Sequence, residues 1–402
     1  MKFKNFFTRS ISLILLFTIL ISSSNCIVTN AQVNKNLSTS QSISNNVPSA
    51  ANIFAKNNYQ DALSVVRSYL GDFDIQIDEL NAATLGNPFV IYNTDTDTQD
   101  AIYYFPIIAQ QKVIIIMNVI NTTRGWSLSL SQDMVDELND IGYANHPQNY
   151  IFYIENEKVI AEQSTNKLEL LKMSLQEKGN STKHKDFDKK SFTDKVNYIK
   201  NTMNSQFVRV DTTTSDNDGN VKDDIDGYSP SFSTNTSTSK ICSLYSSQGQ
   251  QNYGRCWAAS IATILNYLNG TSITAANVCD RMNIGYDTGA SISTAMNAMA
   301  SYTTPSYTNL IYSQASFSNV KTNIGAKKPM YLSTVKTSDS NSGHAVVLYG
   351  YQTISVSDYV VLWNPGLNSG AGGTQIVYYS STGTTFAYNN STYKWRYTLS
   401  SV

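Results

Sequence analysis

A long polar stretch, Asp211 to Lys240, limits how this chain can fold. It consists almost throughout of Ser, Thr, Asp, Asn and Gly, which bury too little apolar surface to offset the entropy of ordering the backbone. The chain has 402 residues, more than one typical domain needs. We therefore expect two folded units joined by a linker, residues 206–239, that is open to proteolysis.

The segment 1–31 has the pattern of a secretory signal peptide. Basic residues precede an uncharged apolar run from Ile11 to Ile21, which is about half as long as a bilayer span requires. Cleavage after Ala31 roughly fits the small-residue rule. We expect the mature protein to be secreted and to have no membrane anchor. Lipidation of Cys26 is the alternative.

Residues 51–205 form the first predicted folded unit, after a polar tail at residues 32–50 that we expect to be disordered. Helices are predicted at Ala51–Leu70, Gln132–Ile141 and Phe192–Met203, and β-rich runs at Phe89–Tyr92, Ile102–Ile108, Val113–Ile120, Trp126–Leu130 and Tyr150–Ile154. Such runs, separated by turn residues, predict an antiparallel meander. The meander has no Cys and no compact acid pair, so we interpret it as a folded pro-region, with an independent binding domain as the alternative.

The two parts of the chain carry opposite net charge. Residues 32–236 hold 17 Lys and Arg against 26 Asp and Glu, whereas residues 237–402 hold 9 Lys and Arg against 4 Asp. Opposite potentials favour docking of one part on the other. Ordinary variation in surface composition is the alternative interpretation.

Cysteine usage argues against a disulfide-stapled scaffold. Beyond the leader, the chain holds only Cys242, Cys256 and Cys279, too few to stabilise a chain of this length. Catalysis is one reason for an exported protein to keep an odd thiol. For Cys242 and Cys279 we favour two free thiols, with a bridge between them as the alternative.

Cys256 has the sequence context of a nucleophile. It follows Gly254-Arg255 and leads into apolar residues at helical spacing, which are Ile261, Ile264, Leu265 and Leu268. Gly270 then predicts the end of the helix. Cys256 therefore begins a buried amphipathic helix, whose N-terminal end favours thiolate over thiol. This segment alone leaves open that Cys256 is a small core residue.

His344 is the histidine that any Cys/His chemistry here has to use, because no other follows residue 184. It starts an apolar strand, and a neutral imidazole near Cys256 can take the thiol proton. Asn364 interrupts a later apolar run just before Pro365. Its side chain is suited to accept from the far ring nitrogen and fix the His344 tautomer; ordinary turn chemistry is the alternative.

These motifs, in this order, resemble the papain-like cysteine proteases, most closely the secreted bacterial staphopain branch. The resemblance covers about residues 240–402 and rests on Gln250 before Gly254-Arg255-Cys256, Gly343-His344-Ala345-Val346, Leu362-Trp363-Asn364-Pro365 and the aromatic run Tyr393–Tyr397. By position it implies the following roles: Cys256 as nucleophile, His344 as base, Asn364 as its orienting partner and Gln250 as side-chain donor of the oxyanion hole. Gln251 is the alternative donor.

The resemblance also implies an α+β fold. Its papain-like catalytic domain, residues 240–402, has a helical part headed by Cys256 and an antiparallel β-barrel-like part that carries His344 and Asn364. By the same resemblance, the substrate cleft lies between these two parts, and the β-rich pro-domain masks it until the linker is cut. The implied function is a secreted cysteine endopeptidase made as a zymogen. We expect a monomer that acts on proteins or peptides, and we expect no metal, other cofactor or nucleic-acid partner.

Two other functions stay open at this point. A peptidoglycan amidase or endopeptidase of the Cys/His type uses the same acyl-transfer chemistry, although no wall-binding repeats are visible. The other is a catalytically inert papain-like binding protein, against which the presence of all four candidate residues argues. Tyr253 stands where eukaryotic papain-like enzymes usually have a disulfide-forming Cys. This departure agrees with the compact bacterial branch.

Overall fold

The computed structural model describes residues 47–94, 99–164, 166–172, 187, 189–207, 237–302, 307 and 309–401. Within these ranges, the side chains of residues 148 and 203–207 are not described. The predicted signal peptide, most of the predicted tail and most of the predicted linker lie outside the described residues. None of the helices within the described ranges has the length and apolar character needed to cross a lipid bilayer.

The N-terminal region, residues 47–207, opens with a helix that buries one face. α1 (Ser49–Ser68) buries Ala55, Ala62 and Val66, which recur at helical spacing. The predicted helix is therefore confirmed, and it begins inside the predicted tail. The other helices are α2 (Leu70–Phe73), α3 (Ile77–Asn81), α4 (Val135–Asp140), a 3-10 turn (Pro147–Asn149) and α5 (Phe192–Phe207). α4 and α5 confirm the two later predictions.

The strands of the N-terminal region form two sheets. The predicted antiparallel meander is confirmed for the runs Ile102–Ile108, Val113–Ile120 and Trp126–Leu130, and it is wrong for Tyr150–Ile154, which lies in the other sheet. The first holds β1 (Thr84–Leu85), β3 (Ile102–Ala109), β4 (Lys112–Thr122) and β5 (Gly125–Ser131); the second holds β2 (Ile91–Asn93), β6 (Ile151–Glu155), β7 (Lys158–Gln163) and β8 (Asn166–Lys172). β2 and β6 pair in parallel. The physical reason is that β4 is buried on both faces. One face packs toward α1, and the second sheet covers the other.

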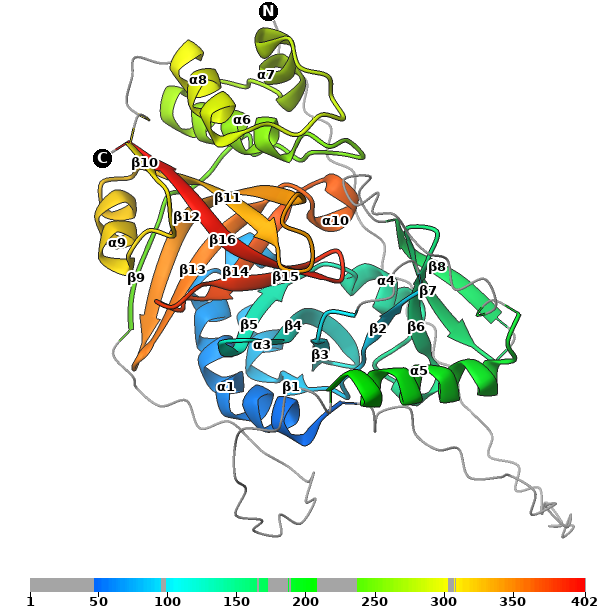
Figure 1. The fold of residues 1–402 in the computed structure, drawn as a ribbon. Coiled ribbons are helices and arrows are strands. Elements are labelled where there is room, and N and C mark those ends of the chain that lie inside the picture. The colour runs from blue at the N-terminus through cyan, green and yellow to red at the C-terminus, as the bar shows by residue number, and fades with distance from the viewer. Residues whose placement is uncertain are drawn as a thin grey trace, which may run out of the picture. The chain divides into compact units, whose positions relative to one another are not determined.

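The C-terminal region, residues 237–401, combines helices with a large antiparallel sheet (Figure 1). Its helices are α6 (Cys256–Asn269), α7 (Ala275–Met282), α8 (Ile292–Tyr302), α9 (Phe317–Gly325) and the short turn α10 (Leu367–Gly370). Its strands are β9 (Ser237–Ile241), β10 (Asn309–Ile311), β11 (Met330–Lys336), β12 (Gly343–Ile354), β13 (Ser357–Asn364), β14 (Gly373–Tyr378), β15 (Thr385–Tyr388) and β16 (Ser391–Ser400). Helices α6, α7 and α8 lie together beyond one side of the sheet. This arrangement is α+β.

The described strands of this sheet pair in the order β14-β13-β12-β11-β16-β10. β15 pairs with β16, and β9 pairs with β12. β9 therefore extends the folded region back into the predicted linker. The pairings among the described strands follow an open path, so the barrel-like closure that the resemblance implies stays a prediction.

The two regions share one sheet, which local sequence patterns do not predict. β5 pairs with β14 in antiparallel register, with Leu130 opposite Ile376. Tyr69 donates a hydrogen bond from its hydroxyl to the Tyr351 carbonyl oxygen, at 2.9 Å. The N-terminal region is thus attached through backbone pairing and buried hydrogen bonds.

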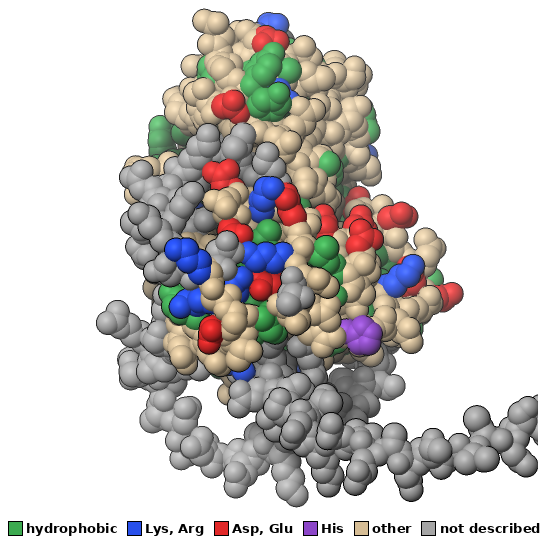
Figure 2. Space-filling view, turned by 90° about the vertical axis from the view of Figure 1, so that its right-hand side faces the viewer, with side chains coloured by type: hydrophobic (Ala, Val, Ile, Leu, Met, Phe, Trp, Pro, Cys, Tyr) green, Lys and Arg blue, Asp and Glu red, His purple; other side chains and the backbone are tan. Residues whose placement is uncertain are grey.

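Charge is present at this junction at Asp100, which accepts a hydrogen bond from the Thr392 N–H at 2.7 Å. Burial raises the pKa of Asp100, while that hydrogen bond and the positive charge of Lys336 oppose the shift. On the face in Figure 2, charged side chains of both signs lie intermixed over the lower part, and fewer lie over the upper part, where α6 to α8 are. The hydrogen bond between Asp100 and Thr392 adds to the backbone pairing that joins the two regions.

Candidate active site

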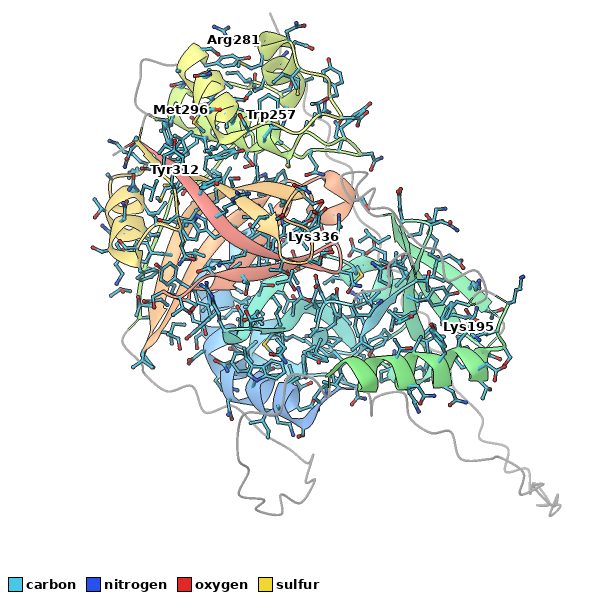
Figure 3. All side chains as sticks on the ribbon, viewed as in Figure 1. Lys195, Trp257, Arg281, Met296, Tyr312 and Lys336 are labelled. Carbon is cyan, nitrogen blue, oxygen red and sulfur yellow. The ribbon has the colours of Figure 1, made fainter. Side chains whose placement is uncertain are left out.

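Cys256 is the first residue of α6, as predicted, and its side chain is only 4% exposed. Because it is the first residue of α6, Cys256 lies at the positive end of the helix dipole. No side chain caps this end of the helix. Trp257 fixes the first turn by donating from Nε1 to the Thr288 carbonyl oxygen at 2.9 Å (Figure 3). Gly270 ends the helix at a φ of 64°. Leu268, predicted to be buried, is 36% exposed because the last turn leaves the core.

The loop before Cys256 is held by Arg255. The Arg255 guanidinium lies 4.5 Å from the ring centroid of Tyr253 and 5.1 Å from that of Tyr286. It also donates from Nη2 to the side-chain oxygen of Gln251, and from Nε to the backbone oxygen of Gln250 at 3.3 Å. Cation–π contacts and hydrogen bonds together therefore fix the approach to α6.

Gln250 is held between the start of α6 and the turn that follows β13. Its backbone N–H donates to the Pro365 carbonyl oxygen at 2.9 Å. At Gly249, a Cβ atom would collide with the backbone oxygens of Gly370 and Ala371, so only glycine permits this close approach. The Gln250 side chain is fully buried, whereas that of Gln251 is exposed. Burial favours Gln250 over Gln251 as the residue beside the site.

His344 and Asn364 meet across neighbouring strands. His344 lies at the start of β12 and Asn364 at the end of β13, and both side chains are buried. His344 Nε2 lies 2.7 Å from Asn364 Oδ1, and the Gly366 N–H donates to the same oxygen at 3.0 Å. The structure thus brings together two residues that are 20 positions apart in the chain.

Burial determines the protonation state of His344. It lowers the pKa of the imidazole to about 4, and the hydrogen bond to Asn364 opposes this shift only in part. His344 is therefore neutral at pH 7. Within the described part of the chain, its Nδ1 is buried and has no hydrogen-bond partner. A neutral ring with a lone pair on Nδ1 is the form that a general base requires.

The helix that starts at Cys256 packs on the strands next to His344. α6 contacts both β12 and β11. On β11, burial raises the pKa of Tyr331, and the nearby charge of a Cys256 thiolate raises it further. Tyr331 is the register partner of Val347 on β12. Cys256 therefore lies near Tyr331 of β11, a strand that pairs with β12, which carries His344.

Two residues that touch this pair were not among the candidates predicted from the sequence. Gln375 of β14 is fully buried and accepts from Asn364 Nδ2 at 3.0 Å. Tyr388 of β15 stacks on His344, with the ring centroids 4.3 Å apart and the planes at 20°. The one signal for Gln375 is a long polar residue inside the run Gly373–Tyr378. Tyr388 could not be predicted, because tyrosine is common in any buried strand and its presence there does not indicate a contact with His344.

Cys242 and Cys279 are free and buried, which confirms the prediction of two free thiols. Burial raises the pKa of each thiol to about 11, so both are poor nucleophiles at neutral pH. In the ranges that the structure describes, no group of three or more His, Cys, Asp or Glu side chains is placed to hold a metal ion.

The comparisons with known proteins point to the same region of the chain. The model of the Peptidase_C39 like family matches residues 243–394, a span that contains Gln250, Cys256, His344 and Asn364. This match supports a cysteine peptidase of the papain-like type. Helices packed beside a large antiparallel sheet are consistent with such a domain. A search of curated proteins gave no match.

Proposed function

We propose that this protein is a secreted cysteine endopeptidase of the staphopain type, made as an inactive precursor. The observation that carries the proposal is a set of three hydrogen bonds that, together with chain neighbours, connects the candidate residues. His344 bonds Asn364, the next residue Pro365 accepts from Gln250, and the Gln250 carbonyl accepts from Arg255, which precedes Cys256.

The proposed reaction begins with proton transfer from Cys256 Sγ to His344 Nδ1. The thiolate attacks the carbonyl carbon of the scissile peptide bond, and the carbonyl oxygen becomes an oxyanion. Asn364 holds the far side of the imidazolium through its contact with Nε2. The N-terminal end of α6 favours the thiolate.

The oxyanion is proposed to accept hydrogen bonds from the Gln250 amide and from the Cys256 backbone N–H. Donors aimed at a developing oxyanion each contribute about 2.7 to 4 kcal/mol. When the tetrahedral intermediate collapses, the C–N bond breaks and His344 Nδ1 returns its proton to the leaving amine. Water then attacks the thioester, with His344 as base, and releases the second product and the free thiol.

We propose that the N-terminal region is the pro-domain. Its β5 extends the sheet next to β14, and Asp133 Oδ1 accepts from the Asn368 N–H at 3.1 Å. Asn368 belongs to α10, which begins shortly after Asn364. The pro-domain thus reaches the turn that supports the proposed orienting residue. Cleavage within residues 206–239 is the proposed activating step.

The test is casein hydrolysis by the secreted protein, before and after cleavage of the linker. We expect the uncut chain to be inactive and the processed chain to be active. Cys256→Ala is expected to lower kcat by about 10⁶-fold, as loss of a nucleophile does. Cys279→Ala is the matched control, because Cys279 is a buried free cysteine of the same region.

Three results would contradict parts of this proposal. Full casein hydrolysis by Cys256→Ala would remove the proposed nucleophile. Loss of turbidity of bacterial cell walls without casein hydrolysis would instead indicate the peptidoglycan-cleaving alternative. Equal activity before and after cleavage of the linker would remove the inhibitory role of the N-terminal region.

A further inference from the structure

Gln375 lies at the centre of the buried network behind His344. Its side chain is fully buried on β14, between β13 and β5. Its Oε1 accepts from Asn364 Nδ2 at 3.0 Å, and its Nε2 donates to the Ala387 carbonyl oxygen at 2.8 Å. A longer contact of 3.4 Å joins Nε2 to Ser129 Oγ of the N-terminal region.

Backbone groups fix the direction of every amide in this network. The Ala387 carbonyl can only accept, so Gln375 presents its NH₂ group there and its oxygen to Asn364. The Gly366 N–H can only donate, so Asn364 presents Oδ1 to it and Nδ2 to Gln375. Two independent anchors therefore agree on one arrangement.

This arrangement determines which ring nitrogen of His344 carries the proton. Asn364 Oδ1 is an acceptor, so His344 Nε2 at 2.7 Å has to be the donor. In the neutral ring, the lone pair is then on Nδ1. Reversal of the Asn364 amide would put NH₂ against Nε2 and move the proton to Nδ1, where it would block proton transfer from Cys256.

We propose that Gln375 is a positioning residue that holds the Asn364 amide in one orientation and thereby fixes His344 as its Nε2–H tautomer. The inference deepens the proposed function, and its catalytic consequence rests on that function. β15 contributes twice, since Ala387 anchors Gln375 and the adjacent Tyr388 stacks on the His344 ring. Tautomer and ring plane are thus set from the same strand.

A purely structural role for Gln375 makes a different prediction, and Gln352 provides the matched control. Gln352 is also buried in the sheet, on β12, and donates from Nε2 to a serine hydroxyl of the N-terminal region, Ser68 Oγ, at 2.8 Å. This hydrogen bond does not involve Asn364. Gln375→Met and Gln352→Met change volume and polarity by similar amounts. A difference between the two variants in the tautomer of His344 therefore indicates a positioning role for Gln375.

The direct measurement is ¹⁵N NMR of the imidazole nitrogens in the full chain with Cys256→Ala, at pH 7.5. The chain has three histidines, and His344→Gln assigns the signal. We expect the Nε2–H tautomer in this background and with Gln352→Met added. Gln375→Met is expected to give a mixture with the Nδ1–H form. An unchanged tautomer in Gln375→Met would overturn the proposal.

Kinetics of the processed enzyme give a second test. Gln375→Met is expected to lower kcat about tenfold, with little change in KM, because a small misplacement of the base slows proton transfer. In the Asn364→Ala background, the same change is expected to cost less than about twofold, since Gln375 acts through Asn364. A full tenfold loss in that background would contradict the proposal.

A conservative variant keeps the test valid if Gln375→Met folds poorly. A protonated carboxyl in Gln375→Glu accepts from Asn364 and donates to the Ala387 oxygen, as the amide does. The ratio of the kcat of Gln375→Glu to that of the wild type is expected to rise as pH falls. A ratio that does not depend on pH would overturn the proposal. If processed wild type hydrolyses no peptide, the proposed function fails, and the tautomer measurement still decides the role of Gln375.

Discussion

Each region of the molecule buries a cluster of polar side chains, and the two clusters differ in whether every buried polar atom has a hydrogen-bond partner. In the N-terminal region, Lys195 of α5 lies 2.8 Å from Glu162, which also accepts from the Tyr153 hydroxyl at 2.6 Å (Figure 3). These groups satisfy one another. In the C-terminal region, the chain of hydrogen bonds ends at His344, whose Nδ1 is buried without a partner among the described residues.

This difference indicates what each cluster is for. A buried ion pair with complete partners stabilises a fold or fixes its register, and it loses stability when one member is removed. A buried polar atom without a partner costs free energy, and such groups concentrate at functional sites. We therefore expect changes in the Lys195 cluster to alter stability, and changes in the His344 cluster to alter kcat.

The largest expected effect on stability is that of Lys195→Met. It leaves Glu162 buried without its cation, and removal of one partner from a buried pair destabilises by about 3 to 5 kcal/mol. Urea denaturation of the full chain measures this. Adding Glu162→Gln is expected to recover most of the loss, because no buried charge is then left without its partner. An unchanged free energy of unfolding in Lys195→Met would break the distinction between the two clusters.

Gln250→Ala is expected to lower kcat by about 10²- to 10³-fold, because it removes one proposed oxyanion donor. The free energy of unfolding and KM are expected to change little by comparison. Gln251→Ala is the matched control, since its side chain is exposed and bonds Arg255. A larger loss of kcat in Gln251→Ala would reassign the donor.

Asn364→Ala is expected to lower kcat by about 10²-fold, because the His344 ring loses the group that orients it. Asn364→Asp keeps an acceptor for Nε2 and is expected to retain part of the activity. Steady-state kinetics on casein-derived peptides measures both. Wild-type kcat in Asn364→Ala would show that the buried network behind His344 is structural, like the Lys195 cluster.

Asp133 gives the smallest predicted effect, at the contact between the two regions. Burial raises its pKa to about 6, with a further contribution from Glu137, while the Asn368 N–H opposes the shift. The folded state therefore favours the protonated carboxyl more than the unfolded chain does. The stability that this contributes to the protein is lost as pH rises through about 6. Asp133 keeps some exposure, so Asp133→Asn is expected to stabilise by about 1 kcal/mol at pH 8.

The same substitution is expected to change stability little at pH 4, where the wild-type carboxyl is largely protonated. Thermal unfolding of the full chain at both pH values measures this difference. An equal effect at pH 4 and pH 8 would show that ionisation of Asp133 does not influence the contact with α10.

Local patterns were sufficient for the reactive elements. The apolar spacing after Cys256 predicted α6, and Gly270 predicted its end, because helix period and a left-handed stop are encoded within a few residues. The strand at His344 and the turn after Asn364 follow from equally local signals. These predictions depend on neighbours in sequence, and the structure confirms the elements.

Long-range pairings were not predictable in the same way. β5 and β14 are separated by most of the chain, and nothing in either sequence specifies the other as partner. Gln375 is similar, because a glutamine within a strand usually indicates a solvent-exposed face. Its role depends on Asn364 and Ala387, which only the assembled sheet brings beside it. The sequence therefore predicted the elements that carry Cys256, His344 and Asn364 better than the residues that pack behind them.

The most direct test of the central claim is a comparison of the three cysteines in the processed protein. An epoxide thiol reagent is applied at pH 7, and mass spectrometry locates the adduct. We expect labelling at Cys256, and none at Cys242 or Cys279, whose thiols have pKa values raised to about 11 by burial. Cys256→Ala is expected to abolish it. An unlabelled Cys256, or equal labelling of all three, would contradict the account.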